Sequence, residues 1–528
     1  MAETVTPQKT QIAVKRGLER LARYRRARAM FIKEFVGQYY EQTVGLSGDE
    51  PINLIFHTIR TMVPNLVMKT GTNLVTTRYT PQRDYGELLG LALDSLDEQI
   101  GLKATLRGWI VAAIFGLGVI KTGLAASGEM LQFGDNTIDP GQVYAKLVSL
   151  DDFVIDPTCT SLNESTFIGD RVRVPRQILL DTDGYDHDLV VKLPLAKINR
   201  KNKVEDISKR DTAVMEMYTL QDYVDVIELW VPEADAVVTI PDPNQIIFEK
   251  YIGLRDYYGP KEGPYTFLSF TPPVPDNPLP VSSVSLWYDI HRMANRIFKK
   301  IMDQSDRQKD ILIYPPSEAD AAQDVVDSKD GDTVMSSNPK EINVVSFGGQ
   351  NRNNEVMLQE AQMWYNYVSG NPDQMAGNMT KGTGAPKESA TRSQIIQSNS
   401  QVGLEDARDI LYDSTAEVNR KMAWYLHTDP LIKIPLTKRA TGGKQIQLFL
   451  TPEQRQGDFF RFTFKIKARS MSRLDPAIRS KRMVEFAVNI LPGLINAAMI
   501  AMQMGQRFNI QRAVTDLAEE LGILDDVM

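Results

Sequence analysis

The stretch SVSLWYDIHRMANRIFKKIMDQSDRQ, residues 283–308, decides how the middle of this chain folds. Its apolar residues recur at spacings of 4, 3, 4 and 4, and they are Leu286, Ile290, Met293, Ile297 and Ile301. Such spacings place side chains on one face of an α-helix. A second set of apolar residues widens that face: Trp287, Ala294, Phe298 and Met302. The stretch therefore predicts a helix that packs against more than one neighbour.

A second helical pattern, NEVMLQEAQMWYNYVSG at residues 354–370, follows after an insert of different composition. The insert contains two short apolar runs, ILIYPP and INVVSFGG, on either side of the acidic segment EADAAQDVVDSKDGD. Short β-branched runs bounded by Pro and Gly predict strands. We therefore expect two helices that form a hairpin, with a small α/β element at its tip.

The next segment, GNMTKGTGAPKESATRS at residues 377–393, has the composition of a phosphate-binding loop. Such a loop needs Gly, four residues and then Gly-Lys before a helix, because its backbone N–H groups wrap the phosphates while the lysine reaches them. Gly377 and Gly382 have that gap, but Thr383 occupies the lysine position. We interpret the segment as a glycine-rich loop between two helices.

A long helix without an internal proline is predicted over residues 388–427. Its apolar stripe alternates gaps of 3 and 4, which is close to a heptad pattern: Leu404, Ala407, Leu411, Thr415, Val418, Met422 and Tyr425. A helix of this length suggests a rod within an assembly. Strands are predicted over residues 431–468, with Phe460, Phe462, Phe464 and Ile466 on one face of the last strand. Helices are expected over 476–491, 493–507 and 509–521.

The N-terminal half reads as helices followed by a β-rich region. Residues 10–43 are basic and helical, with apolar residues too sparse for a deep core helix. We consider a solvated arm, an arm on a neighbouring subunit and an arm on phosphates. A helix pair is expected over residues 51–75, and residues 85–122 read as helix passing into strand. From residue 143 to 270 the apolar period changes to two, which predicts strands.

Bulk composition narrows the class of protein. A chain of 528 residues is too long for one core, and its net charge of −7 excludes a generally basic nucleic-acid binder. Cys159 is the single cysteine, so no intrachain disulfide can form. The apolar window 483–504 contains Glu485 and Pro492. We interpret it as two packed helices broken at Pro492-Gly493 rather than as a membrane span.

Catalytic and metal-binding patterns are weak. The four histidines stand in no HExxH or Ser/His/Asp pattern: His57, His187, His291 and His427. The segment DTDGYDHD at residues 181–188 resembles half of a calcium loop, but Lys192 stands where the bidentate Glu should be. We expect no enzyme activity, no metal and no cofactor.

In the order of its parts, the sequence resembles the portal protein, or head-to-tail connector, of tailed double-stranded DNA bacteriophages. The stretch NLIFHTIRTMVPNLV is similar to the N-terminal helical element of portals. The stretch GWIVAAIFGLGVIKTG is similar to a helix-to-strand step with a Gly-x-Gly-x-x-Lys core. KLVSLDDFVIDPTCTS resembles a strand of the wing region, and GTGAPKESATRSQI resembles the loop that opens the long helix. The resemblance covers residues 50–520 and lies in the order of these stretches.

The resemblance implies an α+β, portal-like ring subunit. Its parts would be an N-terminal arm and wing that is helical and then β-rich (1–282), stem helix 1 (283–308), a small α/β clip (309–354), stem helix 2 (355–369), a tunnel loop (370–391), a long wing helix with wing strands (392–470) and a short helical crown (471–528).

The same resemblance implies function and partners. The copies, twelve in most of the family, would form a ring at one capsid vertex of the virion, assembled in the host cytoplasm. The channel would pass double-stranded DNA without sequence specificity during packaging and ejection. The terminase large subunit would dock on the clip, followed by head–tail adaptor proteins. Contacts with the major capsid and scaffolding proteins are also expected, and none with a membrane.

Two sets of residues are the candidate sites. The helical stripe Leu286, Ile290, Met293, Ile297 and Ile301 is expected to pack the stem. The cations Lys381, Lys387 and Arg392 on the tunnel loop can touch the DNA backbone without reading sequence, and the alternative is an ordinary disordered turn. An acidic wall with few cations suits a conduit, because strong phosphate attraction would hold the DNA in place.

Two other classes of protein compete with this interpretation. A DNA-packaging nucleotide hydrolase would need a complete phosphate-loop lysine followed by an acidic strand, and the sequence contains neither. A capsid or other assembly protein without a pore would share the helices and strands but lack a central hole. An ATPase assay tests the first alternative, and images of the purified protein test the second.

Overall fold

The computed structural model describes residues 6–36, 52–125, 131–133, 136–138, 141–196, 222–347, 349, 351–370, 390–429, 434–439, 445–450, 455, 457–467, 470–471, 484, 486–503 and 514. The fold is mixed α+β, with 52% helix, 20% strand and several small antiparallel sheets. The expected α+β class is therefore confirmed.

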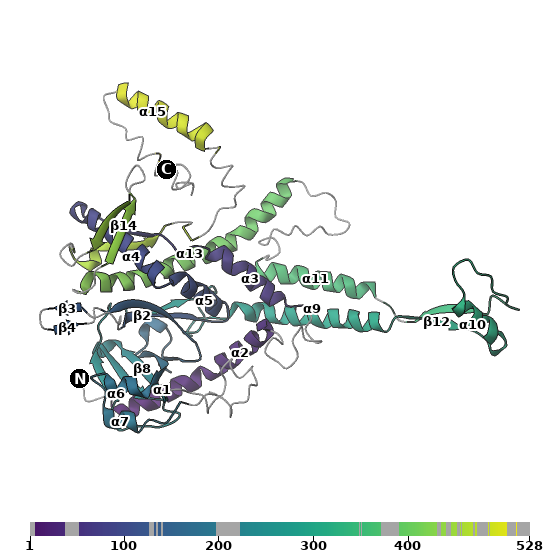
Figure 1. The fold of residues 1–528 in the computed structure, drawn as a ribbon, viewed down its shortest axis with the longest axis horizontal. Coiled ribbons are helices and arrows are strands. Elements are labelled where there is room, and N and C mark those ends of the chain that lie inside the picture. The colour runs from purple at the N-terminus through teal and green to yellow at the C-terminus, as the bar shows by residue number, and fades with distance from the viewer. Residues whose placement is uncertain are drawn as a thin grey trace.

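Two consecutive helices open the chain and lie along the β-rich part of the molecule (Figure 1): α1 (Pro7–Arg20) and α2 (Ala22–Val36). Val14, Leu18 and Leu21 are buried there, so the expectation of too few apolar residues for core packing is wrong. A Cβ added at Gly17 would collide with the carbonyl oxygen of Ile155, because the helix lies directly on that strand.

Two antiparallel sheets form the β-rich region predicted over residues 143–270. The larger has the order β10-β9-β8-β7-β6, and its strands are β6 (Phe153–Ile155), β7 (Ile168–Pro175), β8 (Tyr223–Val231), β9 (Ala236–Pro241) and β10 (Gly253–Asp256). The smaller has the order β11-β2-β5, and its strands are β2 (Gly118–Ala125), β5 (Gln142–Val148) and β11 (Tyr265–Leu268). The short elements beside them are β3 (Leu131–Phe133), β4 (Asn136–Ile138), α6 (Arg176–Asp181) and α7 (His187–Val191).

Helices from both halves of the chain build the largest core cluster. They are α3 (Leu54–Leu66), α4 (Arg83–Gln99), α5 (Leu102–Ile114) and α13 (Ala390–Thr428). The α5-to-β2 succession confirms the predicted passage from helix to strand, and α13 confirms the predicted long helix. Buried side chains of this cluster include Leu89, Trp109 and Leu411.

The helix pair predicted over residues 51–75 is wrong in its second half. Only α3 forms, with Pro64 in its last turn, where the missing N–H and the ring bulk limit the helix. The following segment is strand β1 (Asn73–Thr77), which pairs antiparallel with β16 (Phe462–Ile466) near the other end of the chain. The long-range partner overrides the local helical pattern.

The predicted hairpin of helices is present and projects from the rest of the molecule, which we call the body (Figure 1). We call α9 (Ser283–Asp306) and α11 (Arg352–Ser369) the hairpin. Residues 309–347 form what we call the tip, with the antiparallel pair β12 (Lys309–Ile313) and β13 (Asn343–Phe347) and the helix α10 (Ala319–Asp327). In Figure 1 the tip lies at the far end of the long axis from the sheets.

The last part of the chain contains a second strand pair and a separate helix. The pair is β14 (Ile434–Arg439) and β15 (Gln445–Leu450). In β16, Phe462 and Ile466 are buried as predicted, but Phe460 precedes the strand and is exposed. A π-helical turn (Phe486–Ile490) leads directly into α15 (Leu491–Gln503), with Pro492 in the first turn of that helix. The predicted break at Pro492-Gly493 is therefore wrong, because the first turn of an α-helix tolerates proline. Most of the predicted helices 476–491 and 509–521 lies outside the described residues.

Candidate assembly surface

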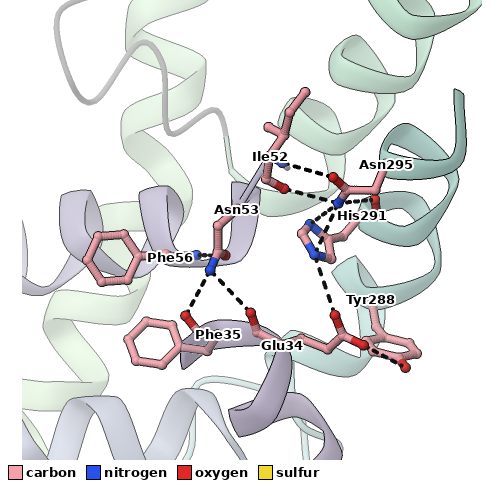
Figure 2. Close-up of polar contacts among 8 residues, drawn as sticks. All are labelled: Glu34, Phe35, Ile52, Asn53, Phe56, Tyr288, His291 and Asn295. Carbon is pink, nitrogen blue, oxygen red and sulfur yellow. Dashed lines mark hydrogen bonds and ion pairs between the residues drawn. The ribbon is translucent and has the colours of Figure 1, made fainter. Parts of the chain in front are cut away.

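The root of the hairpin is fixed to the body by hydrogen bonds between side chains and backbone (Figure 2). The amide of Asn295 on α9 accepts from the backbone N–H of Ile52 at 3.0 Å and donates to its carbonyl oxygen at 3.0 Å. The same Nδ2 donates to the carbonyl oxygen of His291 at 3.1 Å. One buried side chain thus holds the segment that precedes α3 against α9.

A second asparagine joins α3 to α2 in the same place (Figure 2). Asn53 caps α3 by accepting from the backbone N–H of Phe56 at 2.9 Å, and its Nδ2 donates to the carbonyl oxygen of Phe35 at 2.8 Å. Glu34 on α2 faces α9, with Oε2 at 3.9 Å from His291 Nε2 and Oε1 at 3.4 Å from the Tyr288 hydroxyl. Hydrogen bonds and close polar contacts therefore connect α2, α3 and α9 at the point where the hairpin begins.

The second helix of the hairpin is held at both ends. Tyr365 is buried, and its hydroxyl lies 2.9 Å from the hydroxyl of Thr58 on α3. At the outer end, Asn354 on α11 donates to Gln304 on α9 at 2.9 Å. These contacts fix the antiparallel alignment of the two helices, so residues that face outward do so from a defined scaffold.

The predicted stem-packing residues differ in burial within the single chain. Ile301 is buried, Ile290 and Ile297 are partly buried, and Leu286 and Met293 are 53% and 42% exposed. The residues of α9 that face the body or α11 lie about one position round the helix: Val284, Trp287, Tyr288, His291, Ala294 and Asn295. The buried polar residues of this face, His291 and Asn295, were not predicted, because the spacing of apolar residues carries no information about buried polar ones.

Large apolar side chains remain exposed on α11. Trp364 is 54% exposed and Tyr367 is 75% exposed, and the others are Val356, Met357, Met363 and Val368. With the exposed residues of α9, they give the hairpin apolar surface that the described part of the chain does not cover. Monomeric proteins seldom leave contiguous apolar patches of more than a few hundred Å² open to water. This surface therefore has the composition of an interface.

The tip also exposes apolar side chains, and these surround one buried, hydrogen-bonded carboxylate. Glu318 is buried and accepts from the Ser336 hydroxyl at 2.8 Å and from the backbone N–H of Asn338 at 3.2 Å. Around it, apolar side chains on the strands, on α10 and on the segments between them are exposed: Ile313, Tyr314, Val325, Val326, Met335, Val344 and Val345. The tip holds its shape but leaves both kinds of element uncovered.

The predicted DNA-contacting cations lie largely outside the described part of the chain. Lys381 and Lys387 fall in residues 371–389, which the structure does not describe. Arg392 belongs to α13, but its side chain is also outside the description. The DNA-contact hypothesis for these residues stays a prediction.

A cavity of about 240 Å³ lies in the body, lined by Lys121, Tyr144, Glu228 and Tyr257 among others. Lys121 Nζ donates to Asp170 at 2.6 Å and to Glu228 at 2.8 Å. Burial lowers the pKa of Lys121, but neighbouring Tyr265, Asp170 and Glu228 outweigh it and hold that pKa well above its usual value. Arg255 also pairs with Glu228 at 3.3 Å, so two cations face two carboxylates, and the cluster connects the two sheets.

Other kinds of site are not seen in the described ranges. Within those ranges, no three or more His, Cys, Asp or Glu side chains are grouped so that they could hold a metal ion. The helices whose residues are described include none that combines the length and apolar composition needed to cross a bilayer.

A scan against protein-family models finds none that matches the chain, and a search of curated proteins finds no similar sequence.

Proposed function

We propose that this chain is a portal subunit, which forms a ring at one capsid vertex and serves as the channel for double-stranded DNA during packaging and ejection. The observation that carries the proposal is the uncovered apolar surface of a hairpin whose root is rigidly fixed. The order of sequence stretches supports it independently. On this proposal the hairpin is the stem, the tip is the clip, and α13 is the long wing helix.

In a ring, each copy would bury the exposed apolar side chains of its hairpin against the next copy. Burying one large apolar side chain contributes about 1.5–3 kcal/mol, so several per hairpin would offset the entropy lost on association. A two-helix hairpin presents different helices on its two sides. A rotation that places α9 of one copy against α11 of the next is heterologous and generates a ring when it closes.

Charges on the hairpin suit that arrangement. Asn354 bonds Gln304, so these two residues are at the same height along the hairpin. Counting from that height toward the body, Lys300 lies four residues away on α9 and Glu360 lies six residues away on α11. At a rise of about 1.5 Å per residue, the two residues therefore differ in height along the hairpin by only about 3 Å. Both side chains are exposed, so a rotated copy would bring opposite charges together.

Partners follow from the same geometry. The tip is the part of the subunit farthest from the sheets and is exposed on several sides, so it is the platform on which terminase and then the adaptor proteins would dock. An assembly protein without a pore is the second candidate, because exposed apolar helices also suit a closed contact without a channel. A nucleotide hydrolase is less favoured, since Thr383 stands in the position of the phosphate-loop lysine.

The test is to remove the apolar surface and count the copies. We expect the purified protein to form rings with a central hole in negative-stain images, and Trp364→Ser with Tyr367→Ser to yield subunits that stay folded but no longer close. The matched control is Ile178→Ser with Ile247→Ser, two exposed apolar residues of the body. It should assemble normally.

Native mass spectrometry of the same samples gives the number of subunits. A stable monomer in every assembly condition would refute the proposal. A closed oligomer without an axial opening would favour the assembly protein instead. Equal loss of assembly in the hairpin variant and the control would remove the role assigned to the hairpin.

A further inference from the structure

The basic residues of α1 and α2 include two sets that differ in what they contact. The inward set binds the β-rich region of the same chain. Arg20 donates to the carbonyl oxygens of Pro157 and Cys159 at 2.6 and 3.1 Å, and Arg25 donates to the carbonyl oxygens of Leu150 and Phe153 at 3.0 and 2.6 Å. These two arginines bind backbone carbonyls of the same chain and so hold the helices against the β-rich region.

The outward set consists of five exposed cations that form no ion pair with any described residue: Lys9, Lys15, Arg16, Arg23 and Arg26. We call these residues the cationic stripe. Only one acidic side chain, Glu19, lies among them on that face. An unpaired local charge of this kind is unusual in a chain whose net charge is −7.

The stripe lies on one face of a nearly continuous helix. The backbone N–H groups of Leu21 and Arg25 bond the carbonyls of Gly17 and Leu21, so the helical pattern passes through the boundary between α1 and α2. At about 100° per residue, the five cations fall within an arc of about 120°, and buried Val14, Leu18 and Leu21 lie on the opposite arc. The stripe is therefore held outward by the packing of the other face.

We propose that the cationic stripe binds the phosphate backbone of duplex DNA. This rests on the proposed function, which makes DNA the polyanion that the assembly handles, and it adds a contact on α1 and α2 to the loop residues predicted to face the channel. The spacing of cations along one helix face suits phosphates, which are contacted without sequence readout.

The composition of the stripe disfavours other partners. The core of a protein–protein interface is apolar and poor in lysine, whereas this stripe consists of five cations. Exposed Ile12 and Met30 share its arc but lie about 27 Å apart along the helix, so they form no joint apolar patch. Binding to a membrane surface requires an apolar helix face that can enter the lipid. Here that face is already buried against the sheet.

The experiment measures how the binding of a short linear duplex depends on salt. The variant carries Lys15→Gln, Arg16→Gln, Arg23→Gln and Arg26→Gln in the full chain. Each phosphate contact contributes about 0.9 to the slope of log K against log salt concentration, so the slope should fall by about 3.6. Arg16→Gln and Arg23→Gln, made singly, should each lower it by about 0.9.

The control removes four exposed lysines elsewhere in the body: Lys69, Lys103, Lys192 and Lys250, each changed to Gln. It should change the slope much less. An equal fall in the control, or no fall in the stripe variant, overturns the proposal. Loss of assembly with unchanged DNA binding would also overturn it, because the partner would then be another copy, and so would binding of the stripe to anionic phosphatidylserine vesicles but not to DNA.

Imaging of the same samples separates this inference from the proposed function. Rings whose DNA binding is insensitive to the stripe variant would leave the portal proposal standing and refute the stripe. A protein that never forms rings but binds DNA through the stripe would refute the portal proposal and leave the stripe proposal standing.

Discussion

The body and the hairpin satisfy their side chains in different ways. In the body, charged groups are buried with partners from the same chain, as Lys121 is between Asp170 and Glu228. In the hairpin and tip, polar groups at the root and centre are satisfied, but Trp364 and Tyr367 face solvent. The difference teaches that the buried charges of the body are paired within the chain, whereas the described residues leave large apolar side chains of the hairpin and tip exposed.

The largest expected effect tests the completeness of the body. Lys121→Met should lower the free energy of unfolding by about 3–5 kcal/mol, because it leaves buried Asp170 without a counter-charge and Glu228 with only the exposed Arg255. Adding Asp170→Asn and Glu228→Gln should restore much of that loss, since no buried charge then remains unpaired. Urea denaturation followed by tryptophan fluorescence measures both variants. A destabilisation below about 1 kcal/mol for the single variant would contradict the role of the cluster.

The next effect contrasts two tyrosines on α11. Tyr365→Ala should cost about 3 kcal/mol of unfolding free energy, because it empties a buried position and removes one of the two hydrogen-bond partners of the Thr58 hydroxyl. Tyr367→Ala should stay within about 0.5 kcal/mol, because that side chain is 75% exposed. The measurement is thermal and urea unfolding of dilute, unassembled subunits. Equal costs at the two positions would mean that the hairpin is not divided into a packed and an open face.

A smaller effect concerns the polar contact between α4 and α13. Asp97 accepts from Asn73 at 2.9 Å and from Asn419 at 3.1 Å, and burial raises the pKa of Asp97 to about 8. The folded state therefore holds a proton that the unfolded chain releases above pH 4 or so. Stability should fall as the pH rises toward 8, by at most about 1.4 kcal/mol for each pH unit.

The variant Asp97→Asn isolates this carboxyl group. Burial also raises the pKa of Asp94, to about 6, so comparison between pH 6 and pH 8 reports mainly on Asp97. The decline in unfolding free energy over that range should be largely absent in the variant. A decline as steep as that of the original chain would assign the pH dependence to another group.

Whether a structural feature can be predicted from the sequence depends on how far apart in the sequence the interacting residues are. The helices α9 and α13 were predictable, because apolar spacing reflects hydrogen bonds between residues four apart. The face of α9 that packs inward was not, because its neighbours come from α2 and α3. The basic N-terminal segment shows the same limit: composition alone does not separate Arg25, which binds backbone carbonyls, from Arg23, which faces solvent.

The sequence by itself determined the class of fold, the long helix, the paired helices with an α/β insert, and the resemblance that led to the portal proposal. Only the tertiary structure decided that Asn73–Thr77 is a strand rather than a helix, that Asn295 fixes the hairpin, and that the cations of α1 and α2 differ in what they contact. The reason is physical: local periodicity records contacts within one turn of chain. The partner of a strand, a buried amide or an arginine lies far away in sequence, and only the folded chain brings it near.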